Sequence, residues 1–222
     1  YKGMDLYRLP EKEMQEIRGK EIALIPQNPT ESLNPIRRIG KQLTECMTVH
    51  GNKDKELANS RRDEFLRRFG FADPDRISRA YSFQLSGGMN QRIALALVML
   101  MQQKLLLADE PTSALDAVTR RNVADELIAM RSDCGIAQMI VTHDFALASY
   151  VADRIAVMHR GMIVELAPAQ ELVSSPLHPY TKALLGSVPI LGGCIPAFPD
   201  VDPEYSGKLI ESSPGHFVLT EV

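Results

Sequence analysis

The sequence predicts an α/β protein whose layered sheet carries an inserted block of helices. Two observations support this fold class. Through the middle of the chain, short apolar runs that fit buried strands alternate with helical segments. Residues 28–87, in contrast, show helical patterns only, which is typical of a helical subdomain inserted into a core of this kind.

Short apolar runs predict the strands. They lie at residues 21–26, 105–109 and 138–142. Helices are predicted at residues 89–103, 117–131 and 145–152. The first of these helices is apolar around most of its circumference, so we expect it to be buried. Further on, two alternating runs flank Arg160-Gly161, which predicts a tight hairpin.

The remaining segments are read from helical periodicity and proline content. A helical pattern runs from Ile39 to about Phe71, where Asp73-Pro74-Asp75 interrupts it. After Pro168 the many prolines predict a loosely structured extension. We therefore divide the chain into residues 1–27 as part of the core, 28–87 as the helical block, 88–168 as the rest of the core and 169–222 as a C-terminal extension.

Composition excludes several classes of function. The 222 residues are 45% hydrophobic, which is ample for a buried core. A net charge of -3 provides no electrostatic footprint for nucleic acid. The three cysteines form no metal-binding spacing and are interpreted as reduced thiols of a cytosolic protein. No apolar run approaches the roughly 20 residues that span a bilayer, so we expect any membrane role to come through a partner.

Ser86-Gly87-Gly88 opens the predicted buried helix. The first N–H groups of a helix have no partner within it and lie at the positive end of its dipole, so such a turn is a ready site for phosphate. A flexible turn with a serine cap is the simpler alternative for these three residues alone.

Asp109-Glu110 ends an apolar strand just before Pro111. This placement suits a Mg²⁺-positioning carboxylate beside a residue that polarises an attacking water molecule. The alternative is a strand that ends in two solvated acids. His143, which follows the strand at 138–142 and precedes Asp144, is equally compatible with a buried, hydrogen-bonded histidine.

Taken together, these motifs resemble those of ABC transporter ATPases. The octet from Leu85 to Arg92 resembles the ABC signature motif, Ser113 to Asp116 resembles the D-loop, and Gln27 matches the glutamine of the Q-loop. The resemblance implies a P-loop NTPase (RecA-like) core with an inserted helical subdomain. It further implies binding and hydrolysis of ATP with Mg²⁺.

The resemblance also assigns roles to individual residues. It implies catalytic roles for Glu110, His143 and Gln27, of which Glu110 polarises water and His143 contacts the γ-phosphate. Asp109 and Gln27 would serve Mg²⁺. Nucleotide-binding roles are implied for Ser86, Gly87, Gly88, Gln91, Asp109 and Asp116.

Within this family the chain is most similar to importers of oligopeptides, dipeptides and nickel. The segment from His178 to Leu185 is the most discriminating part of that similarity. The resemblance implies a head-to-tail dimer with an identical or paralogous ATPase subunit, because the signature turn serves a nucleotide held by the second subunit. It also implies transmembrane permease subunits, an indirect solute-binding partner, no nucleic acid, and a peripheral location at the cytoplasmic face of a bacterial inner membrane. A soluble ABC-type ATPase without a transport role is the alternative.

The chain departs from the family pattern at three points. It contains no Gly-x-x-x-x-Gly-Lys-Ser/Thr phosphate loop, and we expect a fragment that lacks the N-terminal strands and is inert by itself. Asn90 stands where the family has Arg or Gln. Cys194 has no neighbouring cysteines with which to hold an iron–sulfur cluster, so none is expected. The missing strands should leave an apolar face of the sheet uncovered.

Overall fold

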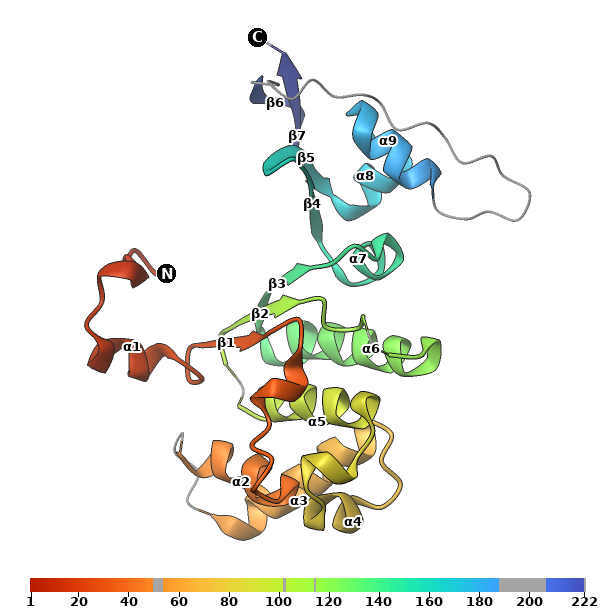
Figure 1. The fold of residues 1–222 in the computed structure, drawn as a ribbon. Helices are drawn as coiled ribbons and strands as arrows, with labels where there is room; N and C mark the ends of the chain where they lie inside the picture. The colour runs from red at the N-terminus through yellow and green to blue at the C-terminus, as the bar shows by residue number, and fades with distance from the viewer. Residues whose placement is uncertain (50–53, 102, 114, 188–206, 222) are drawn as a thin grey trace. The chain divides into compact units, whose positions relative to one another are not determined.

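The computed structural model describes residues 1–49, 54–101, 103–113, 115–187 and 207–221 (Figure 1). The chain divides into two compact units, Tyr1–His143 and Asp144–Val222. Each unit has its own sheet, and we describe each by itself.

The sheet of the first unit consists of three parallel strands in the order β1-β2-β3. These strands are β1 (Ile22–Ile25), β2 (Leu105–Asp109) and β3 (Ala137–Val141). All three strands predicted in the core are therefore confirmed. Their pairing aligns Ile25 with Ala108 and Asp109 with Val141, so that the three strands end at the same edge of the sheet.

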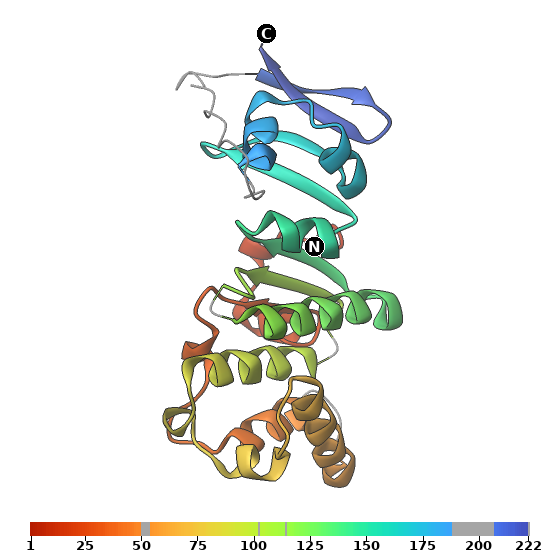
Figure 2. The same cartoon turned by 90° about the vertical axis from the view of Figure 1, so that its right-hand side faces the viewer.

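Two long helices lie on one side of this sheet. They are α5 (Gly87–Met99) and α6 (Ala117–Cys134). Asp116 caps the N-terminus of α6, and Gly135 ends the helix in the left-handed conformation with φ +66°. Both views of the first unit show the sheet, α6, α5 and then the helical block in succession (Figures 1 and 2).

In its described residues, the helical block has three α-helices instead of one continuous pattern. They are α2 (Ile39–Val49), α3 (Lys55–Arg68) and α4 (Pro74–Arg79). Aspartate side chains cap α3 and α4, and Pro74 occupies the first turn of α4, where its missing N–H costs nothing. The remaining helices of the first unit are α1 (Glu11–Ile17) and the short 3₁₀ helices η1 (Leu6–Arg8), η2 (Pro29–Ser32) and η3 (Ser82–Gln84). Within residues 28–87 the described part of the chain contains no strand, as predicted.

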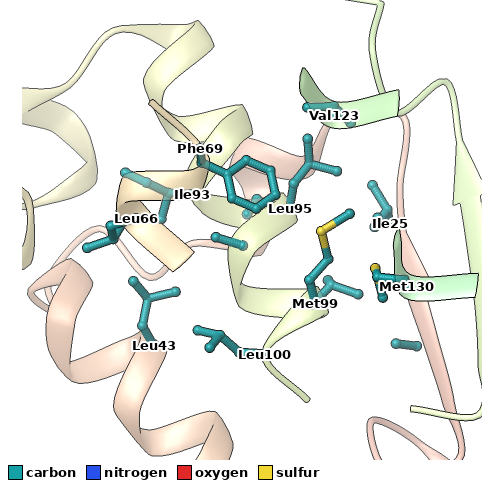
Figure 3. Close-up of a cluster of buried hydrophobic side chains, with 14 of the residues drawn as sticks. Ile25, Leu43, Leu66, Phe69, Ile93, Leu95, Met99, Leu100, Val123 and Met130 are labelled. Carbon is teal, nitrogen blue, oxygen red and sulfur yellow. The ribbon is translucent and has the colours of Figure 1, made fainter. Parts of the chain in front are cut away.

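Helix α5 lies at the centre of the hydrophobic core (Figure 3). Ile93 and Leu95 are fully buried, and Met99 is 2% exposed. Leu66 from α3 and Ile25 from β1 belong to the same cluster, so α5 joins the helical block to the sheet. The prediction that this helix is buried is confirmed, although it ends at Met99 and not at Gln103.

One face of the sheet exposes apolar side chains. Leu24 is 60% exposed on β1, and Met139 and Val141 on β3 are 63% and 55% exposed. An uncovered apolar face was expected from the sequence. Apolar surface gathered on one sheet face is typical of a surface that another element or partner covers.

The second unit contains an antiparallel sheet in the order β4-β5-β7-β6. Its strands are β4 (Arg154–His159), β5 (Met162–Pro168), β6 (Gly207–Ser213) and β7 (His216–Glu221). Arg160 and Gly161 both have positive φ, as a type I′ hairpin turn requires, which confirms the predicted hairpin.

The expectation of a loosely structured segment after Pro168 is wrong for the described residues. The described residues of this unit form the helices α7 (Phe145–Val151), α8 (Ala169–Ser174) and α9 (Pro179–Gly186). Of these, α8 and α9 follow Pro168, and so does the β6–β7 hairpin. Leu172 is fully buried and Leu219 is 6% exposed, so these elements contribute to a packed core.

Cys194 lies outside the described residues. In the described part of the chain, no helix combines the length and the apolar character needed to cross a membrane.

A buried ion network stabilises the second unit. His216 is 1% exposed, and its Nε2 lies 2.7 Å from Glu165 Oε1 while its Nδ1 lies 2.9 Å from Glu171 Oε1. Glu165 also accepts the N–H groups of Leu177 and His178. Two ring nitrogens can both donate to carboxylates only in the imidazolium form, so this arrangement favours the protonated ring of His216. This ion network joins β7 to β5 and α8.

The network makes the stability of the second unit depend on pH. Burial alone would lower the pKa of His216, but hydrogen bonds to Glu165 and Glu171 outweigh it and raise that pKa above the ordinary 6.5. The stabilisation from His216 is therefore complete below pH 6.5 and is lost as pH rises through the raised pKa. The pKa values of both glutamates are lowered from 4.5, because hydrogen bonds to their carboxylates outweigh burial. Their contribution is present above pH 4.5 and is lost as pH falls through the lowered pKa values.

We predict that the second unit is most stable between pH 4.5 and 6.5. In His216→Gln, the stability of this unit should no longer fall as pH rises above 6.5. Denaturant unfolding of the 222-residue chain across this range measures the effect, and NMR titration of the His216 ring reports its pKa directly. A ring pKa at or below 6.5 would contradict the prediction.

Candidate functional site

The predicted site residues Gln27, Glu110 and His143 all follow strands of the parallel sheet. Gln27 comes after β1 and Pro26, Glu110 comes directly after β2, and His143 comes two residues after β3. Because the strands are parallel and in register, these residues lie at the same edge of the sheet. The carboxyl ends of parallel strands are where α/β proteins bind ligands.

Glu110 and His143 are in direct contact. Glu110 Oε1 accepts the backbone N–H of His143 at 2.8 Å and lies 2.6 Å from His143 Nδ1. Since the carboxylate accepts both groups, Nδ1 carries a proton. The Glu110 side chain is 14% exposed and that of His143 is 79% exposed. The pair therefore consists of a sheltered carboxylate and an accessible imidazole.

The backbone of Glu110 adopts an unusual conformation. Its φ is +48°, in the left-handed region that non-glycine residues rarely adopt. The N–H of Glu110 donates to Val141 on β3, and the Glu110 carbonyl accepts the N–H and hydroxyl of Ser113. These bonds hold the residues from Glu110 to Ser113 as a tight turn. Strain of this kind persists only where the surroundings impose it, and it occurs most often at functional sites.

Asp109 and Gln27 carry the oxygen donors predicted for Mg²⁺. Asp109 is half-buried at the end of β2, and Gln27 is exposed beyond β1. One carboxylate and one amide oxygen suit this hard cation, which commonly takes few protein ligands and completes its shell with phosphate oxygens and water. Across the described ranges, no group of three or more histidine, cysteine or acidic side chains forms a metal site. The residues present fit Mg²⁺ bound together with a phosphate ligand.

Ser86 begins α5 as the sequence predicts. Its hydroxyl accepts the N–H of Met89 at 3.3 Å, so Ser86 is the N-cap of this helix. A Cβ placed on Gly87 or Gly88 would meet no heavy atom within 4 Å. The helix N-terminus is thus open to the close approach of an anion.

Gln91 and Asp116 occupy different settings. Gln91 is 2% exposed, and its Nε2 donates to the carbonyl of Pro111 at 3.2 Å, within the turn that begins at Glu110. Asp116 is exposed and caps α6 through Thr119. Hydrogen bonds from the Thr119 hydroxyl and backbone N–H groups lower the pKa of Asp116. The direct roles of both residues in nucleotide binding stay predictions.

Two features of the site were not predicted from the sequence. The pairing of Glu110 with His143 depends on the register of β2 and β3, which the sequence does not specify. The link between Gln91 and Pro111 joins residues 20 positions apart across the core. The periodicity of α5 carries a signal for this link, because Gln91 lies four residues before Leu95 and eight before Met99, on the buried face of the helix.

Two family models match the chain. The model described as "ABC transporter" matches residues 1–113. The model described as "Oligopeptide/dipeptide transporter, C-terminal region" matches residues 164–196.

Curated relatives cover most of the chain. It is 41% identical over 191 residues to the oligopeptide transport ATP-binding protein OppD of Bacillus subtilis, covering 86% of this chain and 53% of that protein. It is 39% identical over 189 residues to the dipeptide transport ATP-binding protein DppD of Escherichia coli, covering 85% of this chain and 58% of that protein. The chain thus spans little more than half the length of these relatives.

Among solved structures, the chain is similar to the ATP-binding cassette MJ0796, whose dimer was determined in a post-hydrolysis state bound to ADP and Pi. The TM-score is 0.65 at 26% sequence identity, and the match covers 73% of this chain and 68% of the cassette.

The left-handed backbone of Glu110 leads to a stability prediction. Glu110→Gly and Glu110→Ala both remove the carboxylate, so their difference isolates the backbone. The left-handed conformation costs an alanine roughly 1–2 kcal/mol and a glycine almost nothing. We expect the glycine variant of the 222-residue chain to be more stable by about 1 kcal/mol, measured by urea denaturation.

A matched pair at Lys104 provides the control. Lys104 precedes β2 without a positive φ, so alanine should be at least as stable as glycine there. An alanine variant at Glu110 that equals or exceeds the glycine variant would show that the turn is not strained.

Proposed function

The chain belongs to the ABC transporter family, and from this premise we propose that it is part of an ATP-binding and ATP-hydrolysing subunit that drives uptake of peptides by an importer. The observation that carries the proposal is the contact between Glu110 and His143 at the carboxyl edge of the sheet. The names of the relatives, which are oligopeptide and dipeptide transport ATP-binding proteins, support the choice of peptides as cargo.

In the proposed mechanism Glu110 orients and polarises the attacking water. Its carboxylate is held by two contacts with His143, so it is positioned before substrate arrives. His143 presents an exposed ring beside that carboxylate and would contact the γ-phosphate. Asp109 and Gln27 would hold Mg²⁺, which when bound offsets the negative charge of the phosphate oxygens.

The open N-terminus of α5 supports a role for Ser86, Gly87 and Gly88 in gripping a phosphate. We propose that this phosphate belongs to a nucleotide held by a second ATPase subunit, either identical or paralogous, in a head-to-tail dimer. The dimeric state of the similar cassette supports this arrangement. The 222 residues carry no glycine-rich lysine loop, so hydrolysis requires a protein that supplies one.

The transmembrane partner is proposed to dock on the helical block beside Gln27. A cavity of about 280 Å³ lies within this block and is lined by four basic residues, Arg38, Lys41, Arg62 and Arg79, with one acid, Asp75, among other residues of the block. A basic hollow of this kind suits contact with a polar loop of another protein. We further propose a peripheral position at the cytoplasmic face of a bacterial membrane and an indirect dependence on a solute-binding protein.

The first test replaces the proposed base. In the complete protein assembled with its transmembrane partner, Glu110→Gln should retain ATP binding and lose turnover by about 10²–10⁴, because removal of a general base raises the barrier of the chemical step. Steady-state ATPase assays and nucleotide-binding measurements separate the two effects.

Two controls accompany this test. Glu11→Gln alters an exposed carboxylate of α1 that pairs with Arg18 and should leave turnover unchanged. The 222-residue chain alone, without a lysine loop, should show no hydrolysis. Turnover near the wild-type rate in Glu110→Gln would refute the role of Glu110.

The second test maps the docking surface. Lys41→Cys lies on α2 beside the cavity and should cross-link to a cysteine in a cytoplasmic loop of the transmembrane partner. Lys208→Cys, an exposed position on β6, is the matched control and should not cross-link. Both variants are made with Cys134 and Cys194 replaced by serine, so that these native thiols do not contribute cross-links. Efficient cross-links at residue 208 or after Pro189, without any at residue 41, would place the contact elsewhere.

A further inference from the structure

We propose that Gln91 is a positioning residue that couples the Ser86-Gly87-Gly88 turn to the turn that carries Glu110. The inference rests on the proposed function and gives Gln91 a role that acts through Glu110, in place of the direct nucleotide contact that the family resemblance implies. In this arrangement Gln91 determines how Glu110 is presented to the attacking water.

The geometry places Gln91 between the two turns. It lies on α5, five residues after the Ser86 cap, and is 2% exposed. Its Nε2 donates to the Pro111 carbonyl at 3.2 Å. Pro111 directly follows Glu110, so this amide fixes the peptide next to the proposed base. A rigid helix thus connects a phosphate-binding terminus to the carboxylate that activates water.

The turn of Glu110 needs support from its surroundings. With φ at +48°, Glu110 occupies a conformation that neighbouring contacts must impose. The β3 strand provides one contact through Val141, and Ser113 closes the turn from within. Gln91 provides a further contact from α5, which is the helix that Ser86 caps.

The oxygen atom of the Gln91 side-chain amide argues against a purely structural role for this residue. Gln91 Oε1 is buried and has no hydrogen-bond partner among the residues that the structure describes. Burial of an unpaired acceptor costs free energy, and an apolar side chain of the same shape would avoid that cost. If Gln91 contributed only to stability, methionine would serve better at this position. Methionine is accommodated elsewhere in α5, at Met89 and Met99. The amide is therefore explained by the contact that Nε2 makes.

This role predicts that stability and turnover separate. Gln91→Met keeps the side-chain shape, removes the unpaired acceptor and loses the bond to Pro111. The folded protein should be at least as stable, while Glu110 loses one support for its orientation. Since a small displacement of a catalytic group can cost about 10² in rate, we expect kcat to fall by about 10-fold to 100-fold. The KM for ATP should not change, because Gln91 is 2% exposed and in this proposal acts only through the turn of Glu110.

The experiment measures steady-state ATPase activity and thermal unfolding of the complete protein assembled with its transmembrane partner. Gln91→Met is compared with Gln138→Met, in which a second glutamine loses an equivalent bond. Gln138 Nε2 donates to the Leu127 carbonyl at 2.7 Å, away from the Glu110 turn. We expect reduced kcat, unchanged KM and an unchanged or higher Tm for Gln91→Met. For Gln138→Met we expect wild-type kcat.

Each outcome decides between explanations. Wild-type kcat in Gln91→Met would overturn the inference. A lower kcat in Gln91→Met would also overturn it if the Tm of that variant fell as well and Gln138→Met lost kcat to the same extent. The proposed function fails separately, through absence of ATP hydrolysis in the wild-type assembly or through wild-type turnover in Glu110→Gln.

Discussion

The site depends on one constraint, which is the in-register parallel pairing of β2 with β1 and β3. This pairing places the ends of the three strands at one edge of the sheet and brings the N–H of Glu110 to the carbonyl of Val141. That bond orients the Glu110 backbone, and the Glu110 carboxylate then receives both donors of His143. A shift of one residue in register would move the alternating side chains to the other face and separate this pair.

The buried helix α5 extends the same constraint into the helical block. Its apolar side chains pack against Ile25 on the sheet side and against Leu66 on the side of the block. Because protein interiors are close-packed, a displacement of the block is transmitted through α5 and is not absorbed within it. The N-terminus of α5 carries the glycine turn, so the same helix connects the proposed docking surface, the proposed phosphate-binding terminus and, through Gln91, the turn of Glu110.

Sequence patterns predicted the elements whose signals are local. The strand at residues 105–109 has the predicted bounds, because an apolar run ends there in two acids and a proline. The β6–β7 hairpin was missed, since prolines dominate the composition of its surroundings and β7 pairs with β5, about 50 residues earlier in the chain. Non-local pairing of this kind leaves little trace in a single window of sequence. The left-handed backbone of Glu110 was also invisible, because a glutamate carries no glycine-like signal for positive φ.

Charge explains why the sheet edge alone is not a complete nucleotide site. Asp109 and Glu110 are adjacent carboxylates at the position where a triphosphate would lie. Like charges at short range in a partly buried setting repel, so a polyanion is disfavoured there until cations intervene. Mg²⁺ and a lysine loop would reverse the sign of this local field. In the proposed mechanism the same acids that repel bare phosphate would therefore favour the metal-bound nucleotide, and hydrolysis would require an assembly in which the cations, the water and the signature turn of a second subunit are all in place.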